Sequence, residues 1–97
     1  MLQEMPVMSS GGGGGSFESR VEQAGTQVVF TGINNAYVTC DAFNNVTVFY
    51  SAYFENGALK TEFEKHNVMT ATFSNGTLTL NCSYSQYGDL TYNIARF

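Results

Sequence analysis

Positively charged residues are scarce in this 97-residue chain. Arg20, Lys60, Lys65 and Arg96 are its only basic residues, against eight acidic ones, and the formal net charge is −4. Proteins that bind nucleic acids or anionic membranes do so with clustered Lys and Arg. These scattered cations cannot form such a cluster, so the sequence predicts neither a nucleic acid nor a membrane as partner.

Long apolar runs are also missing. No stretch approaches the roughly 18 apolar residues of a membrane-spanning helix. Residues 1–8 have neither the basic start nor the apolar run of a secretory signal. We therefore expect a soluble chain that is made in a cytoplasm, and the earlier removal of a leader is left open.

Cysteine is rare and tryptophan is absent. Cys40 and Cys82 are the only cysteines and no CxxC occurs, so a disulfide framework is excluded and structural zinc has no support. The pair either stays as two buried thiols or forms one disulfide, depending on the redox compartment. Two inward cysteines fit an immunoglobulin-type sandwich, but the missing tryptophan limits that likeness to the sandwich itself.

The N-terminal residues 1–16 are predicted to form an arm, and residues 17–97 a folded domain. Ser9–Ser16 consists of serine and glycine alone. The glycine run is followed by neither a lysine nor a helix, so it is a flexible tether rather than a phosphate-binding loop. We expect the apolar head before it either to dock on a neighbouring subunit by strand addition or to stay a disordered tail. The docking residues would be Met5, Pro6, Val7 and Met8.

Beyond the arm, the chain alternates Val, Thr, Tyr and Phe with polar residues, and turn residues recur about every 8–12 positions. The expected strands are 17–22, 27–31, 36–41, 46–54, 59–65, 68–73, 77–84 and 90–97. This pattern predicts an all-β domain, a small antiparallel β-sandwich of about eight strands. A small β-barrel is the alternative.

Asn56-Gly57 and Asn75-Gly76 predict two tight hairpins, because both central residues of a type I′ turn need positive φ. The first turn would pair Phe54 with Leu59, Ala52 with Thr61, Tyr50 with Phe63, Tyr53 with Lys60 and Ser51 with Glu62. The second would pair Phe73 with Leu78, Ala71 with Leu80, Met69 with Cys82, Thr72 with Thr79 and Thr70 with Asn81. Both registers place apolar residues on one face and polar residues on the other.

The apolar faces define the expected core. Its members are Val28, Phe30, Val38, Cys40, Val48, Tyr50, Phe54, Leu59, Phe63, Met69, Ala71, Phe73, Leu78, Leu80, Cys82, Leu90, Tyr92 and Ile94.

Residues suited to catalysis do not form a recognisable group. His66 is the only histidine, and it lies at a strand boundary rather than beside an outward-facing thiol. Glu62 and Glu64 would share one exposed face, about 7 Å apart, where acids usually protect a sheet edge. We therefore expect no enzyme activity, no cofactor and no metal site.

Aromatic residues are the better candidates for binding. Phe49 and Tyr53 are expected on the outer face of strand 46–54, and Tyr87 in an exposed turn. Such rings can form a protein contact or stack on a sugar. They can also be covered by a loop or by the N-terminal strand.

The head Met5-Pro6-Val7-Met8-Ser9-Ser10, followed by the glycine run, resembles the start of small proteins of tailed phages. This resemblance implies a minor virion component, such as a decoration, tail or fibre-associated protein. The first hypothesis is therefore a structural assembly protein that docks through its arm, made in a bacterial cytoplasm and carried in the virion. The second is an adhesion module that binds carbohydrate or a cell surface through Phe49, Tyr53 or Tyr87.

Overall fold

The computed structural model describes residues 15–42, 47–84, 86 and 88–97. This part of the chain contains eight strands and no α-helix. They are β1 (Ser16–Gln23), β2 (Val28–Phe30), β3 (Ala36–Ala42), β4 (Val48–Glu55), β5 (Ala58–Lys65), β6 (Met69–Ser74), β7 (Thr77–Cys82) and β8 (Asp89–Arg96). Every strand expected from the sequence is present, with its ends shifted by at most two residues.

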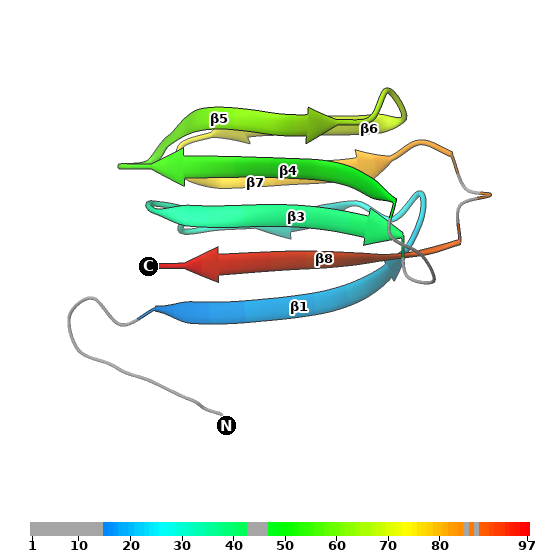
Figure 1. Ribbon diagram of the computed structural model, residues 1–97, viewed down its shortest axis with the longest axis horizontal. Coiled ribbons are helices and arrows are strands. Elements are labelled where there is room, and N and C mark those ends of the chain that lie inside the picture. Colours follow the sequence, from blue (N-terminus) through cyan, green and yellow to red (C-terminus); the bar gives the residue numbers. More distant parts are fainter. Residues whose placement is uncertain (1–14, 43–46, 85, 87) are drawn as a thin grey trace.

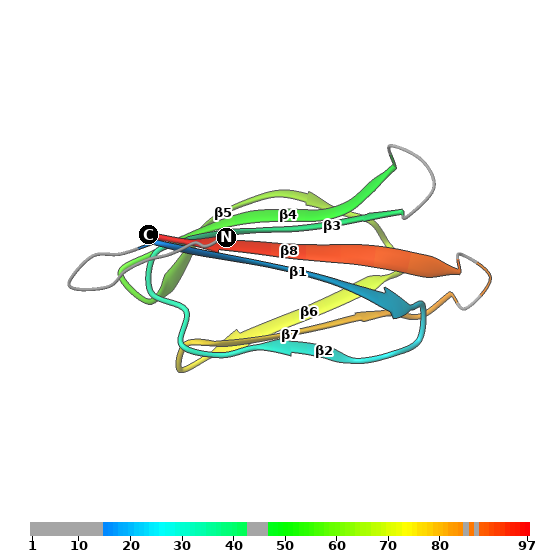
Figure 2. The ribbon, with the colours of Figure 1, turned by 90° about the horizontal axis from the view of Figure 1, so that it is seen from below.

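The strands form two antiparallel sheets packed face to face (Figures 1 and 2). The larger sheet has the order β1-β8-β3-β4-β5, and the smaller has the order β2-β7-β6. This arrangement confirms the predicted small β-sandwich. In the face-on view, β6 and β7 of the smaller sheet lie behind β5 and β4, whereas β1 lies beyond the smaller sheet (Figure 1).

The core lies between the sheets and consists of apolar side chains from both. Those that are buried are Val28, Phe30, Ile33, Ala36, Val38, Cys40, Phe49, Tyr50, Ala52, Phe54, Met69, Leu78, Leu80, Cys82, Leu90, Tyr92 and Ile94. Most of the expected core is confirmed. Ala71 and Phe73 are only partly buried, and the expectation was wrong for Val48, Leu59 and Phe63, which are exposed.

The two Asn-Gly turns have the predicted backbone geometry. Asn56 and Gly57 have φ values of 54° and 77°, and Asn75 and Gly76 have 51° and 75°. The β6–β7 hairpin follows the predicted register along its whole length, from Ser74 opposite Thr77 to Met69 opposite Cys82.

The β4–β5 hairpin keeps its predicted register only next to the turn, where Phe54 lies opposite Leu59. The register then shifts twice, so that Ala52 faces Glu62 and Ser51 faces Glu64. Each shift leaves one unpaired residue on β5, as in a β-bulge. The two glutamates therefore lie opposite neighbouring residues of β4, instead of sharing the one face that the sequence predicted.

The bulges also explain the error for Phe63, which is 58% exposed. Phe63 is skipped by the second register shift and is not paired with Tyr50, which lies opposite Lys65. All eight residues of β5 are exposed. This strand therefore adds little to the core beyond its pairing with β4.

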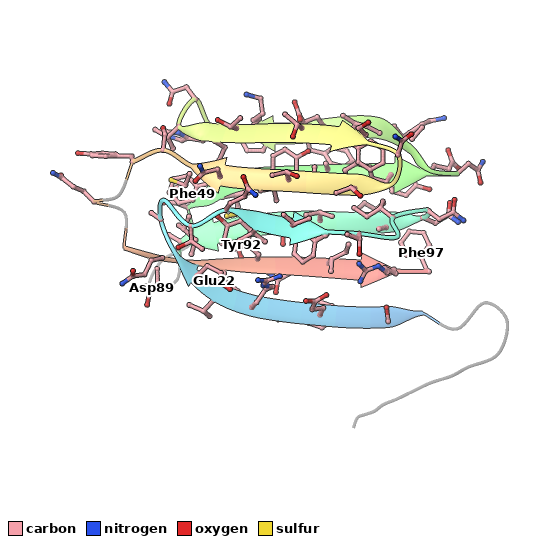
Figure 3. The ribbon with its side chains drawn as sticks, turned by 180° about the vertical axis from the view of Figure 1, so that it is seen from behind. Glu22, Phe49, Asp89, Tyr92 and Phe97 are labelled. Atoms are coloured by element: carbon pink, nitrogen blue, oxygen red, sulfur yellow. The ribbon has the colours of Figure 1, made fainter. Side chains whose placement is uncertain are left out.

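A third bulge corrects the prediction for Phe49. Cys40 pairs with Tyr50 but Asp41 pairs with Val48, so Phe49 is the extra residue on β4. Phe49 and Tyr50 are both buried, whereas Val48 is 41% exposed. Phe49 and Tyr92, labelled in Figure 3, both belong to the buried core.

These bulges reverse the expected roles of two phenylalanines. We expect Phe49→Ala to destabilise the protein by about 3–5 kcal/mol, because it leaves a cavity in the core. Phe63→Ala should cost less than about 1 kcal/mol, because the ring is largely in water. Urea unfolding of both variants measures the difference, and equal losses would contradict the register of β4 and β5.

Candidate functional site

Three aromatic rings gather on the outer face of the larger sheet, and we call Tyr37, Tyr53 and Phe97 the aromatic platform. The ring centroids of Tyr37 and Tyr53 are 4.9 Å apart, and those of Tyr37 and Phe97 are 5.8 Å apart. Tyr53 and Phe97 stack nearly parallel, with centroids 6.2 Å apart and an interplanar angle of 10°. Tyr37 and Phe97 are 48% and 55% exposed.

The strand register extends this surface across the sheet. Tyr37 lies opposite Tyr53 on one side and opposite Ala95 on the other. Ala95 in turn lies opposite Phe17 of β1, whose ring is 69% exposed. Directly opposite residues in an antiparallel pair point to the same face. The platform is thus part of a row of apolar side chains that runs from β4 to the edge strand β1.

Asn35, in the loop between β2 and β3, ties the platform end of the sandwich together. Its carbonyl oxygen accepts a hydrogen bond of 2.9 Å from the amide of Phe97. Its side-chain oxygen accepts one of 3.0 Å from the amide of Asn56. One loop residue therefore fixes both the end of β8 and the β4–β5 turn. Figure 3 shows Phe97 at this end of the sheet.

The charges next to the platform are balanced. Glu55 pairs with Lys60 at 3.3 Å, and Arg96 pairs with Glu18 at 3.7 Å. Desolvation, followed by the negative charge of Glu55, raises the pKa of the Tyr53 hydroxyl. A hydrogen bond to Glu55 contributes to this rise, and the hydroxyl stays protonated at neutral pH.

The geometry suits contact with a flat apolar surface. Exposed rings gain free energy when a partner covers them, and tyrosine adds a polar group for orientation. Both a protein side chain and the apolar face of a sugar ring meet this description. The arrangement offers no nucleophile or acid–base pair.

The residues that the sequence predicted for binding do not all lie on this surface. Tyr53 belongs to the platform, whereas Phe49 is 1% exposed and cannot contact a partner of the folded domain. Tyr87 lies outside the described residues, as do Met5, Pro6, Val7 and Met8. The sequence analysis missed Tyr37 and Phe97. A signal for both was present in the sequence. Side chains alternate strictly around the buried Val38 and Ile94, so Tyr37 and Phe97 point outward. They form one surface only because the two strands are neighbours.

The two cysteines are free thiols, and both are fully buried. Cys40 lies on β3 in the larger sheet and Cys82 on β7 in the smaller one. Of the two states that the sequence left open, the structure therefore has the pair of thiols. Burial raises the pKa of Cys40 to about 12, so its reactive thiolate form is very rare at neutral pH.

His66 has a structural role in the turn between β5 and β6. Its ring nitrogen Nδ1 accepts a hydrogen bond of 3.3 Å from the amide of Val68. Its backbone amide donates to the carbonyl of Phe49 at 2.8 Å, and the two rings meet edge to face at 5.3 Å. These contacts hold the turn in which the chain passes from one sheet to the other.

Within residues 15–42, 47–84, 86 and 88–97, no three His, Cys, Asp or Glu side chains are grouped closely enough to hold a metal ion. The same part of the chain has no helix long and apolar enough to cross a membrane. Comparison of the chain with protein-family models, curated proteins and solved structures found no match.

The burial of both cysteines predicts slow alkylation. In the native protein at pH 8, iodoacetamide should leave the thiols unmodified for hours, because the pKa of Cys40 is about 12 and both side chains are inaccessible. In urea, both should react within minutes. Mass spectrometry counts the added groups, and rapid labelling of the native protein would contradict this burial.

Proposed function

We propose that this protein is a non-enzymatic assembly protein that joins neighbouring subunits through its N-terminal arm. The observation that carries the proposal is the position of the aromatic platform next to the point where the arm joins the domain. Gly15, the first described residue, packs so closely on β8 that a Cβ there would lie 2.8 Å from the carbonyl oxygen of Arg96. Phe97, the residue that follows Arg96 at the end of β8, is a member of the platform.

The platform supports a protein partner. Phe17 continues it across the sheet, and these rings lie on the face of the larger sheet that is turned away from the smaller sheet. Clustered exposed aromatic residues often mark interaction sites and supply much of the binding energy at protein interfaces. A neighbouring subunit that is tethered by the arm would be held close to this surface.

The resemblance of the head to tailed-phage proteins sets the biological context of the proposal. Under it, the protein is a minor virion component that is made in the bacterial cytoplasm and then incorporated into the particle. A decoration, tail or fibre-associated role is consistent with a small sandwich that carries an arm.

A carbohydrate-binding role is the second candidate, favoured by the stacked pair Tyr53 and Phe97. Two nearly parallel rings, of which that of Phe97 is exposed and that of Tyr53 partly exposed, can cover the apolar face of a sugar. In that case the platform would act without the arm.

Removal of residues 1–14 tests the assembly role, because the variant keeps every described strand. We expect the full chain to self-associate and the shortened chain to be monomeric, as measured by light scattering over a range of concentrations. The matched control is replacement of residues 1–8 by Gly and Ser, which keeps the length but removes the apolar head. Equal masses for all three proteins would contradict the assembly role.

The shortened chain also tests the carbohydrate role. Under the carbohydrate role, the shortened chain should bind sugars on a glycan array. Tyr53→Ala should then weaken this binding about tenfold, because it removes one stacking surface. Tyr53→Phe keeps the ring and should retain most of the affinity. If no sugar binds, or if binding does not depend on Tyr53, the carbohydrate role is contradicted and the assembly role remains.

A further inference from the structure

The two sheets have four edge strands, and three of them are protected against pairing with another strand. β1 points Glu18, Arg20 and Glu22 to the inner side, opposite the buried Ile94, Tyr92 and Leu90. β5 carries four charged residues and two bulges. β2 has only three residues. Inward charges, bulges and short strands are the usual means by which proteins block sheet edges.

The fourth edge strand, β6, has none of these features. It is six residues long, with the sequence MTATFS, and has no charged residue and no proline. It pairs with β7 over its whole length without a register shift. A regular, uncharged edge of this length is a template for a further strand.

The hydrogen-bonding pattern shows which groups of β6 are available. In an antiparallel pair, alternate residues bond to the partner strand and the residues between them point their N–H and C=O groups away. The two residues that flank a two-residue turn form a bonded pair, so Ser74, Thr72 and Thr70 bond to β7. Met69, Ala71 and Phe73 therefore face the open edge.

The outward backbone N–H and C=O groups of Met69 both have hydrogen-bond partners. Its amide donates to the carbonyl of His66 at 2.9 Å, and its carbonyl accepts a bond of 3.4 Å from Nζ of Lys65. At Ala71 and Phe73 no residue in the described part of the chain bonds to the outward N–H or C=O. The open edge thus offers two donors and two acceptors, two residues apart.

The core is also incompletely covered along this edge. Ala71 and Phe73 are packed against the core but are only partly buried. The ring of Phe73 contacts that of Phe54 at 4.8 Å, and Leu59, opposite Phe54, is 41% exposed. A strand added beside β6 with apolar inward side chains would cover this side of the core.

The head of the arm matches this edge in spacing and chemistry. Met5 and Val7 are apolar and two residues apart, with Pro6 between them. Proline has no N–H, so it fits a strand only where its nitrogen points away from the partner. That condition directs the N–H and C=O groups of Met5 and Val7 toward β6. It also places their side chains on the same face as those of the opposite residues, Phe73 and Ala71.

We propose that the segment Met5–Val7 of one copy adds to β6 of a neighbouring copy as an antiparallel strand, with Met5 opposite Phe73 and Val7 opposite Ala71. The inference rests on the proposed function, in which the arm joins neighbouring subunits. It names the receiving surface as the β6 edge, separate from the aromatic platform.

The geometry favours a neighbouring copy over the arm's own domain. The arm joins the domain at β1, which lies at the opposite side of the sandwich from β6 (Figure 1). Four strand spacings of about 4.8 Å and a sheet separation of about 10 Å put the two edges about 22 Å apart through the interior. A glycine-rich chain of eight residues spans about 16 Å on average. Reaching its own β6 around the surface would need nearly full extension.

Proline substitutions in the full-length chain test this register, because only every second residue of the head uses its N–H. Val7→Pro should weaken self-association about tenfold, as measured by sedimentation equilibrium, because it removes a donor to β6. Met8→Pro, the adjacent control, should have little effect, because its nitrogen points outward. On the receiving side, Ala71→Pro should weaken association similarly, whereas Ala71→Val should retain it. Circular dichroism confirms that the Ala71 variants fold.

The pattern of results separates this inference from the proposed function. Loss of association on deletion of residues 1–8, with equal effects of Val7→Pro and Met8→Pro, would overturn strand addition and leave arm docking in place. No effect of the deletion would overturn both. As an independent readout, the amide of Phe73 should exchange with solvent at least about tenfold more slowly in the assembled full chain than in the chain without residues 1–8. Equal slowing in full-length monomers at high dilution would show docking on the arm's own domain and overturn the proposal.

Discussion

The structure depends on the burial of the inner face of a five-stranded sheet by a sheet of only three strands. Burial of this apolar face is the main stabilising contribution in a domain that has few charges and no disulfide. On this face Val38, Tyr50, Tyr92 and Ile94 are inaccessible to solvent. The edge strands β1 and β5 consist mostly of exposed residues, and their charged residues are consistent with that exposure.

Both candidate interaction surfaces lie outside this buried interface. The outer face of the larger sheet is turned away from the smaller sheet, and Tyr37 and Phe97 on it are exposed beside Tyr53. On the side of the sandwich where β5 adds little cover, the edge of β6 keeps Phe73 only half-buried. Most aromatic residues of the core are inaccessible to solvent, whereas these two places keep rings that a partner could cover.

Polar loop contacts fix the geometry of the platform end. Asn35 joins the last residue of the chain to the Asn56-Gly57 turn, and the adjacent Asn34 accepts a bond of 2.9 Å from the amide of Gly57. The amide of Ile33 donates to the carbonyl of Gly76 at 2.9 Å, so the same loop also holds the second hairpin turn. One end of the molecule thus holds both hairpin turns, the end of β8 and the point where the arm joins the domain.

The sequence by itself determined the eight strands, the two Asn-Gly turns and the complete β6–β7 register, because these depend on residues close together in the chain. It could not determine the bulges in β4 and β5, because they break the side-chain alternation from which the register was predicted. That is why Phe49 was expected outside and Phe63 inside. Tertiary structure alone brought Tyr37, Tyr53 and Phe97 together, since strand order in a sheet is decided by contacts between distant segments.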